Sequence, residues 1–477
     1  MNIGRWKSPA ALCGLMTAAL LLVQAALMGA GLSHISGAGE AMALSALFAL
    51  VYGGAMLAYA RMAKPGAGEM LFVGVFAAVA MLARTAMLDF ETADYVSFLS
   101  KWTQMFREGG FALLAQNVGD YNLLYQYILL LIAKIPLFDL YLIKWVTVIF
   151  DYVLAASMLL AARYYAGDRA GKAAFLLVLA LPTVLLDGAC WGQCDPVYVS
   201  MIVLSLYFLE TDRPMPSAVL LSFSFAFKLQ TIFFFPVVLL GLLQRRFKLR
   251  HALVFFAAYI VTMIPALAAG RPFIDALSVY ANQSMGQYYD RLSYNAPNLY
   301  LFFPMLEFAS SQEFTWMRYI PGIDAKGTNE YLTEALMPAL QHAALYACVI
   351  LTLIAVIYWL IHYREITPDM TLELALFFAI FLPFVMPKIH ERYFFMADML
   401  SVLYAAKRSD RRFIPLLVVG ASLMSYIPYL TRQRPLDERW LALMMFAALV
   451  IVTRDLLAGM RRNRAALAAE AMKGGAC

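Results

Sequence analysis

The sequence predicts an all-α, polytopic integral membrane protein, on three observations. Hydrophobic residues make up 63% of the 477 residues and charged residues only 14%, which is about half the charged share of an average soluble domain. Apolar runs near the ~20 residues that a helix needs to cross a bilayer recur along almost the whole chain. The longest relatively polar stretches, 89–122 and 271–334, are too short for a separate soluble enzyme. The net charge of +6 suits anionic lipid at the membrane surface, and no nucleic-acid partner is expected.

The first three helices follow from the rule that Lys and Arg mark cytoplasmic loops. Cationic side chains near the N-terminus place it in the cytoplasm, and apolar segments at 9–32, 41–60 and 69–88 then carry the chain out, back and out again. We interpret the first segment as a retained helix, because it is too long for the apolar part of a signal peptide and further spans follow.

The same rule applied from the other end places the C-terminus in the cytoplasm, because a basic run stands at 461–464. Counting back from there puts the stretch around His390 outside. The two counts agree that the regions near Asp89 and His390 share the outer face.

Several apolar segments in the middle of the chain are short for full crossings: 123–137, 173–187, 217–227 and 229–243. Such helices are tolerated only where their exposed backbone is buried in protein or lines a wet cavity. We therefore expect twelve to fourteen helices, to within about one, and a cavity that opens at the outer leaflet.

Asp89 is the first candidate functional residue, since ionisable side chains at membrane depth are costly and tend to be functional. It stands where the third helix leaves the membrane, so its carboxylate can be held in one geometry at a cavity mouth. Glu91 and Asp94 follow closely, and we interpret them as an ordinary acidic start of a loop.

The loop after Asp89 has an amphipathic pattern that is broken at Gly109 and Gly110. The pattern predicts two short helices that lie in the membrane interface with their apolar side down. Asp120 then precedes the next apolar segment. A helix-capping role and a catalytic or substrate-binding role both remain open for it.

Two further motifs place polar residues at breaks between apolar runs. The first contains Trp191, Gln193 and Asp195; Trp191 alone would also suit an interface anchor, and Asp195 a helix cap. In the second, Lys228 stands among aromatic residues without an acidic neighbour in the sequence. An unpaired lysine there is expensive unless an anion binds it, with snorkelling to the membrane surface as the alternative.

Four residues of a later loop suit hydrogen bonding to a polar ligand at an aromatic rim: Arg291, Tyr294, Asn295 and Asn298.

The most charged motif at an outer membrane boundary contains His390, Glu391 and Arg392, followed by aromatic residues. Arginine binds phosphate through its planar fork, and histidine and lysine add charge or donors. Together with Lys228, His390 and Arg392 form a predicted clamp for a lipid phosphate, and Glu391 can orient either cation. An ion pair of Glu391 with Arg392 or Lys388 is the alternative, but it leaves His390 and Lys228 without a role.

These motifs, in this order, resemble the GT-C superfamily of membrane glycosyltransferases, and most closely the bacterial family related to the second mannosyltransferase of GPI-anchor synthesis. The segments that carry the resemblance lie within about 81–405: LDFETADYVSFLSKW, DYNLLYQY, WGQCDPVY, FKLQTIFFFP, SYNAPNLY and MPKIHERYFFMADMLS. HERYFF is the most specific of them, whereas Asn122 and Leu123 replace the family's prolines. The implied organisation is an added hairpin at 1–64, a catalytic membrane domain at 65–460 and a basic cytoplasmic tail at 461–477.

The resemblance implies an inverting transferase that uses a polyprenyl-phosphate-linked sugar and a glycan or lipid acceptor, outside the bacterial plasma membrane. Asp89 would be the general base, and Asp120 would contact the acceptor or support Asp89. Lys228, His390 and Arg392 would hold the leaving lipid phosphate. No cofactor is expected; a divalent metal beside Asp89 and Glu91 is compatible with the sequence but is not predicted.

Two other functions compete with this one. A transporter or flippase of lipid-linked sugars also needs broken helices and buried charges, but no inverted repeats are evident. A glycan polymerase or ligase would use a similar phosphate clamp, usually with a large Arg-rich outer loop, and 271–334 carries few arginines.

Overall fold

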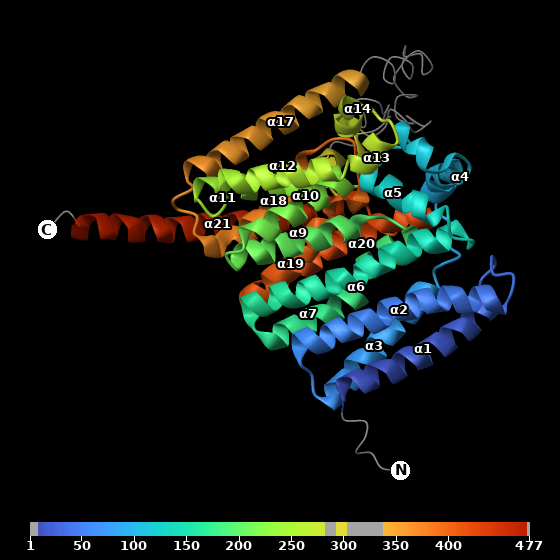
Figure 1. The fold of residues 1–477 in the computed structure, drawn as a ribbon. Helices are drawn as coiled ribbons and strands as arrows, with labels where there is room; N and C mark the ends of the chain where they lie inside the picture. Colours follow the sequence, from blue (N-terminus) through green and yellow to red (C-terminus); the bar gives the residue numbers. More distant parts are fainter. Residues whose placement is uncertain (1–7, 282–291, 303–336, 475–477) are drawn as a thin grey trace, which may run out of the picture. The chain divides into compact units, whose positions relative to one another are not determined.

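The computed structural model describes residues 8–281, 292–302 and 337–474. These residues are almost entirely helical (Figure 1); the strands among them are one parallel pair, β1 (Ser293–Tyr294) and β2 (Ile389–His390). The prediction of an all-α membrane protein is confirmed. Arg291, which was predicted to contact substrate, lies outside the described residues.

Eight helical segments of the described residues are long and apolar enough to cross a membrane, or nine if one bent pair forms a single span. The eight are α1 (Pro9–Gly31), α2 (Ala38–Ala63), α3 (Ala67–Thr85), α6 (Asp139–Ala166), α17 (Met337–Ile361), α18 with the turn before it (Pro368–Val385), α20 with the turn before it (Ser409–Thr431) and α21 (Glu438–Gly474). The bent pair joins α7 (Asp168–Ala180) to α8 (Pro182–Leu185) and η4 (Leu186–Trp191) at 48°. The predicted multi-pass character is confirmed.

Other apolar helices of the described residues are shorter than a full crossing. These are α5 (Leu123–Ile132), α10 (Pro214–Phe227), the helical run Leu229–Leu243 that contains η5 (Leu229–Phe234) and α11 (Phe235–Leu243), and α12 (Leu249–Val261). Their shortness agrees with the sequence, which predicted interrupted helices in this region.

The chain divides into two compact units, Met1–Thr231 with Arg250–Met285, and Ile232–Leu249 with Gly286–Cys477. In the first unit α1 and α2 form a hairpin that packs on α3 and α6 (Figure 1). The long helix α6 also packs on α7 and α9 (Asp195–Glu210), and α9 packs on α10. In the second unit α18, α19 (Phe395–Lys407), α20 and α21 pack on one another.

A buried ion pair connects three helices inside the first unit. The Arg84 guanidinium on α3 lies 2.7 Å from the Asp151 carboxylate on α6, and both side chains are fully buried. Arg84 also donates to the backbone carbonyls of Ala80 and Leu179, each at 3.1 Å. Mutual pairing of this kind is how a charge is accommodated at membrane depth.

Lys144 fixes the turn at which the chain leaves α3. Its buried ammonium on α6 donates to the carbonyls of Met87, Leu88 and Phe90, at 2.7, 3.0 and 2.7 Å. These carbonyls follow the end of a helix, where backbone acceptors lack intrahelical donors. Asp89 therefore stands on a turn whose two flanking carbonyls are bound by one cation.

The predicted pair of short helices after Asp89 is present, as α4 (Ser100–Gly109) and the 3₁₀-helix η3 (Gly110–Ala115). The chain breaks between them at Gly110, whose φ of +56° favours glycine. Gly119 further along has a φ of +72°, and a Cβ at this position would lie 2.4 Å from the Trp102 ring. Only glycine thus lets α4 approach the start of α5. The placement of α4 and η3 in the membrane interface stays a prediction.

We expect Lys144→Met to loosen the turn around Asp89, because three carbonyls lose a charged donor worth about 1.5–3 kcal/mol per hydrogen bond. Amide hydrogen exchange at residues 87–92 should rise by about tenfold or more, measured on the purified protein in detergent. Lys172→Met is the matched control, since Lys172 pairs with Glu69 at 2.8 Å in the same unit and does not touch this turn. Unchanged exchange at 87–92 in Lys144→Met would contradict the assigned role.

Candidate functional site

The Asp89 carboxylate accepts hydrogen bonds at both oxygens. The Tyr141 hydroxyl donates to Oδ1, and the backbone N–H of Ser33 donates to Oδ2 at 3.0 Å. The Tyr141 hydroxyl in turn accepts from the backbone N–H of His34 at 3.1 Å. Ser33 and His34 belong to the turn between α1 and α2, so the N-terminal hairpin contributes to the surroundings of Asp89. The sequence did not predict this contribution.

These hydrogen bonds determine the ionisation of Asp89, which lies beyond the end of α3. Partial burial raises the pKa of the Asp89 carboxyl, but the donors from Tyr141 and Ser33, with the nearby His34, outweigh it and bring the pKa below its ordinary value. A donor to a carboxylate favours its charged form. Asp89 is therefore ionised at neutral pH and held in one orientation.

A second carboxylate in the same loop organises two of the predicted substrate-binding residues. The indole N–H of Trp191 and the side-chain amide of Gln193 both donate to Oδ2 of Asp94, at 3.0 and 2.8 Å. The Tyr121 hydroxyl donates to Oε1 of Gln193 at 2.9 Å. The sequence alone predicts no more than an ordinary loop position for Asp94. Its distance of only five residues from Asp89 was the one signal that could have found it.

Lys228 is not unpaired, which corrects the expectation from the sequence. Its ammonium lies 2.7 Å from both carboxylate oxygens of Asp195, and both side chains are buried. The ammonium also lies 5.5 Å from the centre of the Tyr198 ring. Asp195 is the first residue of α9, so one acid stands at a helix N-terminus and also neutralises the lysine. The sequence could not predict this ion pair, because its two residues are 33 positions apart in the chain.

Asp120 is exposed and does not cap α5. The cap is Asn122, whose side-chain oxygen accepts from the backbone N–H of Leu123 at 2.8 Å. Asn122 also donates to the Tyr259 hydroxyl at 3.1 Å. One of the two residues that replace the family's prolines thus starts the helix by capping it. The catalytic or acceptor-binding role of Asp120 stays a prediction.

In the second unit, the loop before α17 is joined to the charged motif before α19. Tyr294 pairs with His390 in the parallel β1–β2 pair, and their rings stack with centroids 4.9 Å apart. Asn295 forms a further bridge to His390. The Asn298 side chain donates to the Met386 carbonyl at 3.3 Å. Residues about 95 positions apart, predicted separately to bind substrate, are therefore neighbours.

The backbone of this junction is strained on both sides. Asn295 and Lys388 have φ values of +55° and +60°, which residues other than glycine adopt at a cost. The Lys388 N–H donates to the Leu292 carbonyl at 2.8 Å, so the unusual turn is fixed by pairing. Glu391, the residue that follows His390, is buried, and Arg392 is half-buried.

The predicted site residues divide between the two units. The first unit contains Asp89, Asp120, Trp191, Gln193, Asp195 and Lys228, and the second contains Tyr294, Asn295, Asn298, His390, Glu391 and Arg392. Convergence of the two groups on one pocket stays a prediction. No group of three or more His, Cys, Asp or Glu side chains arranged to hold a metal ion is present among the described residues.

Comparison with known proteins identifies the family to which the chain belongs. The family model for glycosyltransferase family 87 matches residues 121–387, which is more than half of the chain. The matched region includes the Asp195–Lys228 ion pair and ends just before His390, while Asp89 precedes it. A comparison with curated proteins gives no match. The chain belongs to glycosyltransferase family 87 and is a multi-pass membrane glycosyltransferase.

Proposed function

We propose that the protein is an inverting transferase of the GT-C type, with Asp89 as its single general base. It moves a sugar, by the family resemblance mannose, from a polyprenyl-phosphate donor to a glycan or lipid acceptor. The reaction takes place on the extracytoplasmic side of the bacterial plasma membrane. The observation that carries this proposal is the Asp89 carboxylate, which is kept ionised by two donated hydrogen bonds on a turn that Lys144 fixes.

Inversion needs one carboxylate that takes the proton of the acceptor hydroxyl while the sugar carbon C1 is attacked opposite the leaving phosphate. Asp89 meets the requirements on such a base. It is half-buried and thus open to an acceptor, and its lowered pKa keeps it ready to accept a proton at neutral pH. A weak base suffices where the bond to the leaving group breaks ahead of the attack by the acceptor, because the sugar then has oxocarbenium character in the transition state.

The leaving phosphate needs positive charge, which Lys228, His390 and Arg392 supply in this proposal. Lys228 already pairs with Asp195, so a phosphate would bind next to an existing ion pair. The stacked Tyr294 ring holds His390 in one orientation, and Arg392 adds a planar fork that suits phosphate. Glu391 orients these cations.

The remaining candidates form the sugar and acceptor contacts. Asp94, held by Trp191 and Gln193, is assigned to the sugar hydroxyls. Asp120 is exposed in the same unit and is assigned to the acceptor. In the second unit Asn295 and Asn298 flank the His390 junction. Arg291 is assigned to the same contacts from its position in the sequence alone.

Asp89→Asn should abolish transfer, because the amide cannot accept the proton of the acceptor. We expect a rate at least 10²–10⁴-fold below wild type, the usual contribution of a positioned base. The measurement is transfer of labelled sugar from a polyprenyl-phosphate donor to membrane glycans by the purified protein. Donor affinity should stay within about twofold of wild type. Glu91→Gln, two residues further along, is the control and should remain active; full activity in Asp89→Asn would eliminate the proposed base.

Tyr141→Phe should shift the acidic limb of the pH–rate profile to higher pH. The hydroxyl donates to the ionised carboxylate and so lowers the pKa of Asp89; without it, that pKa rises. Transfer should then fall off at a higher pH than in wild type as pH is lowered, while the rate well above the limb changes less. Tyr95→Phe, which removes a hydroxyl bound to Asp139, serves as the control. An unmoved limb would show that Asp89 ionisation does not govern the rate.

Arg392→Ala should weaken donor binding by about tenfold or more, since a hydrogen bond to a charged group contributes about 1.5–3 kcal/mol. The readout is the KM for the donor in the transfer assay. Arg432→Ala removes an exposed cation elsewhere in the same unit and should leave KM unchanged. The clamp is refuted if both variants bind the donor as wild type does.

A further inference from the structure

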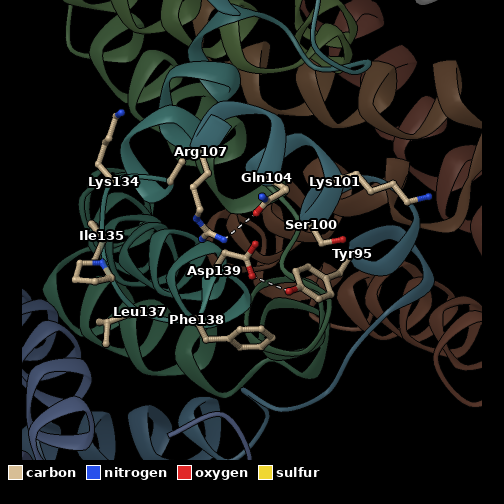
Figure 2. A pocket seen from close by; sticks show the side chains of 12 residues that line it. Tyr95, Ser100, Lys101, Gln104, Arg107, Lys134, Ile135, Leu137, Phe138 and Asp139 are labelled. Atoms are coloured by element: carbon tan, nitrogen blue, oxygen red, sulfur yellow. Dashed lines mark hydrogen bonds between the residues drawn. The ribbon is translucent and has the colours of Figure 1, made fainter. Parts of the chain in front are cut away.

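The first unit contains a cavity of about 850 Å³ (Figure 2). One wall is formed by η2 (Tyr95–Leu99) and α4, and the other by the connection between α5 and α6. Polar and charged side chains alternate around it with the apolar residues of that connection. A cavity of this volume accommodates a small ligand or a lipid headgroup.

The charges that line this cavity are predominantly positive. Lys101, Arg107 and Lys134 border it, against the single acid Asp139 among the lining residues. Figure 2 shows Arg107 between the two lysines. None of the three cations forms an ion pair with a described residue, although Arg107 donates to Oε1 of Gln104 at 3.1 Å.

Asp139 does not supply the missing countercharge. Its Oδ1 accepts from the Tyr95 hydroxyl at 2.7 Å and from the Leu140 N–H at 2.9 Å, and its side chain is buried. Glu108, the nearest acid along α4, accepts a hydrogen bond from Gln104 at 2.7 Å. The cavity therefore presents three cationic side chains whose charge no described acid pairs with, and it suits an anion.

The surroundings identify the anion as part of a lipid. Val96, Phe98 and Met105 are large apolar side chains that are exposed on the elements forming one wall, and Phe111 is exposed on η3, which follows α4. These exposed side chains agree with the predicted placement of the segment in the membrane interface, where they would lie among the lipid tails. Ile135 and Leu137 add apolar surface inside the cavity itself. Basic pockets at this depth suit the phosphate of a headgroup whose tails remain in the bilayer.

We propose that this cavity binds the phosphate of a lipid headgroup, with Lys101, Arg107 and Lys134 as its ligands. None of these three cations belongs to the clamp assigned to the leaving phosphate. The site adjoins Asp89 through Phe138, which lines the cavity and whose ring lies 5.1 Å from that of Tyr141, the residue that donates to Asp89. Binding at this site does not depend on the proposed function, although its position would bring the bound lipid next to the proposed base.

The test is a titration of the purified full-length chain in detergent, followed by native mass spectrometry. The probes are phosphatidylglycerol, diacylglycerol with the same acyl chains and no phosphate, and glycerol 3-phosphate. We expect the triple variant Lys101→Ala/Arg107→Ala/Lys134→Ala to bind phosphatidylglycerol at least tenfold more weakly than wild type. All three side chains are exposed at least in part, so their removal leaves the packed core intact.

Two control variants make the result specific. Arg169→Ala removes an exposed cation of α7 that does not line the cavity and should bind phosphatidylglycerol as wild type does. The charge-conserving variant Lys101→Arg/Arg107→Lys/Lys134→Arg should retain binding, which excludes misfolding as the cause of the loss. Asp89→Asn should also retain it, so a failure of the proposed base and a failure of this site are distinguishable.

Each outcome decides a point. Displacement of phosphatidylglycerol by glycerol 3-phosphate would show that the phosphate alone is recognised, and cation-dependent binding without displacement would show that the acyl chains contribute; both support the site. Equal affinity in the triple variant and wild type would overturn it. Diacylglycerol binding with the same dependence on the three cations, or an equal loss in Arg169→Ala, would also overturn it.

Discussion

The hydrogen bonds from Lys144 to three carbonyls constrain the rest of the site. A buried ammonium must find acceptors inside the protein, and the end of α3 leaves carbonyls that must find donors. The Lys144 ammonium donates to these carbonyls, which fixes the turn after α3 against α6. Asp89 lies on that turn, and Tyr141, one turn before Lys144 on α6, reaches its carboxylate. The orientation of the proposed base is thus set by the backbone it stands on.

The N-terminal hairpin completes this arrangement. The family resemblance implies that residues 1–64 precede the catalytic core as an addition, yet Ser33 and His34 in the turn of this hairpin donate to Asp89 and to Tyr141. Hydrogen bonding to the charged form of a carboxylate lowers its pKa. The ionisation of the proposed base therefore depends partly on a segment outside the region that the family model matches.

Hydropathy predicted the N-terminal helices well, because it depends only on the sequence within one segment. The helix expected at 9–32 is observed at Pro9–Gly31, and the break at Gly110 follows from its backbone geometry. Partner choice could not be predicted in this way. Lys228 pairs with an acid on another helix, and Lys144 is one charge in a 28-residue helix whose acceptors are backbone atoms. Such contacts depend on how helices pack, which periodicity does not encode.

Two groups of cations among the described residues of the first unit differ in a way that bears on function. Arg84, Lys144 and Lys228 are buried, and each is bound by a carboxylate or by carbonyls of its own unit. Their charges stabilise helix positions. Lys101 and Lys134, by contrast, lie exposed around a cavity and form no ion pair with a described residue. Unlike the three buried side chains, the cations around the cavity hold no helix in place through an ion pair with a described residue. Their grouping at the predicted membrane interface is what recognition of an anionic headgroup requires.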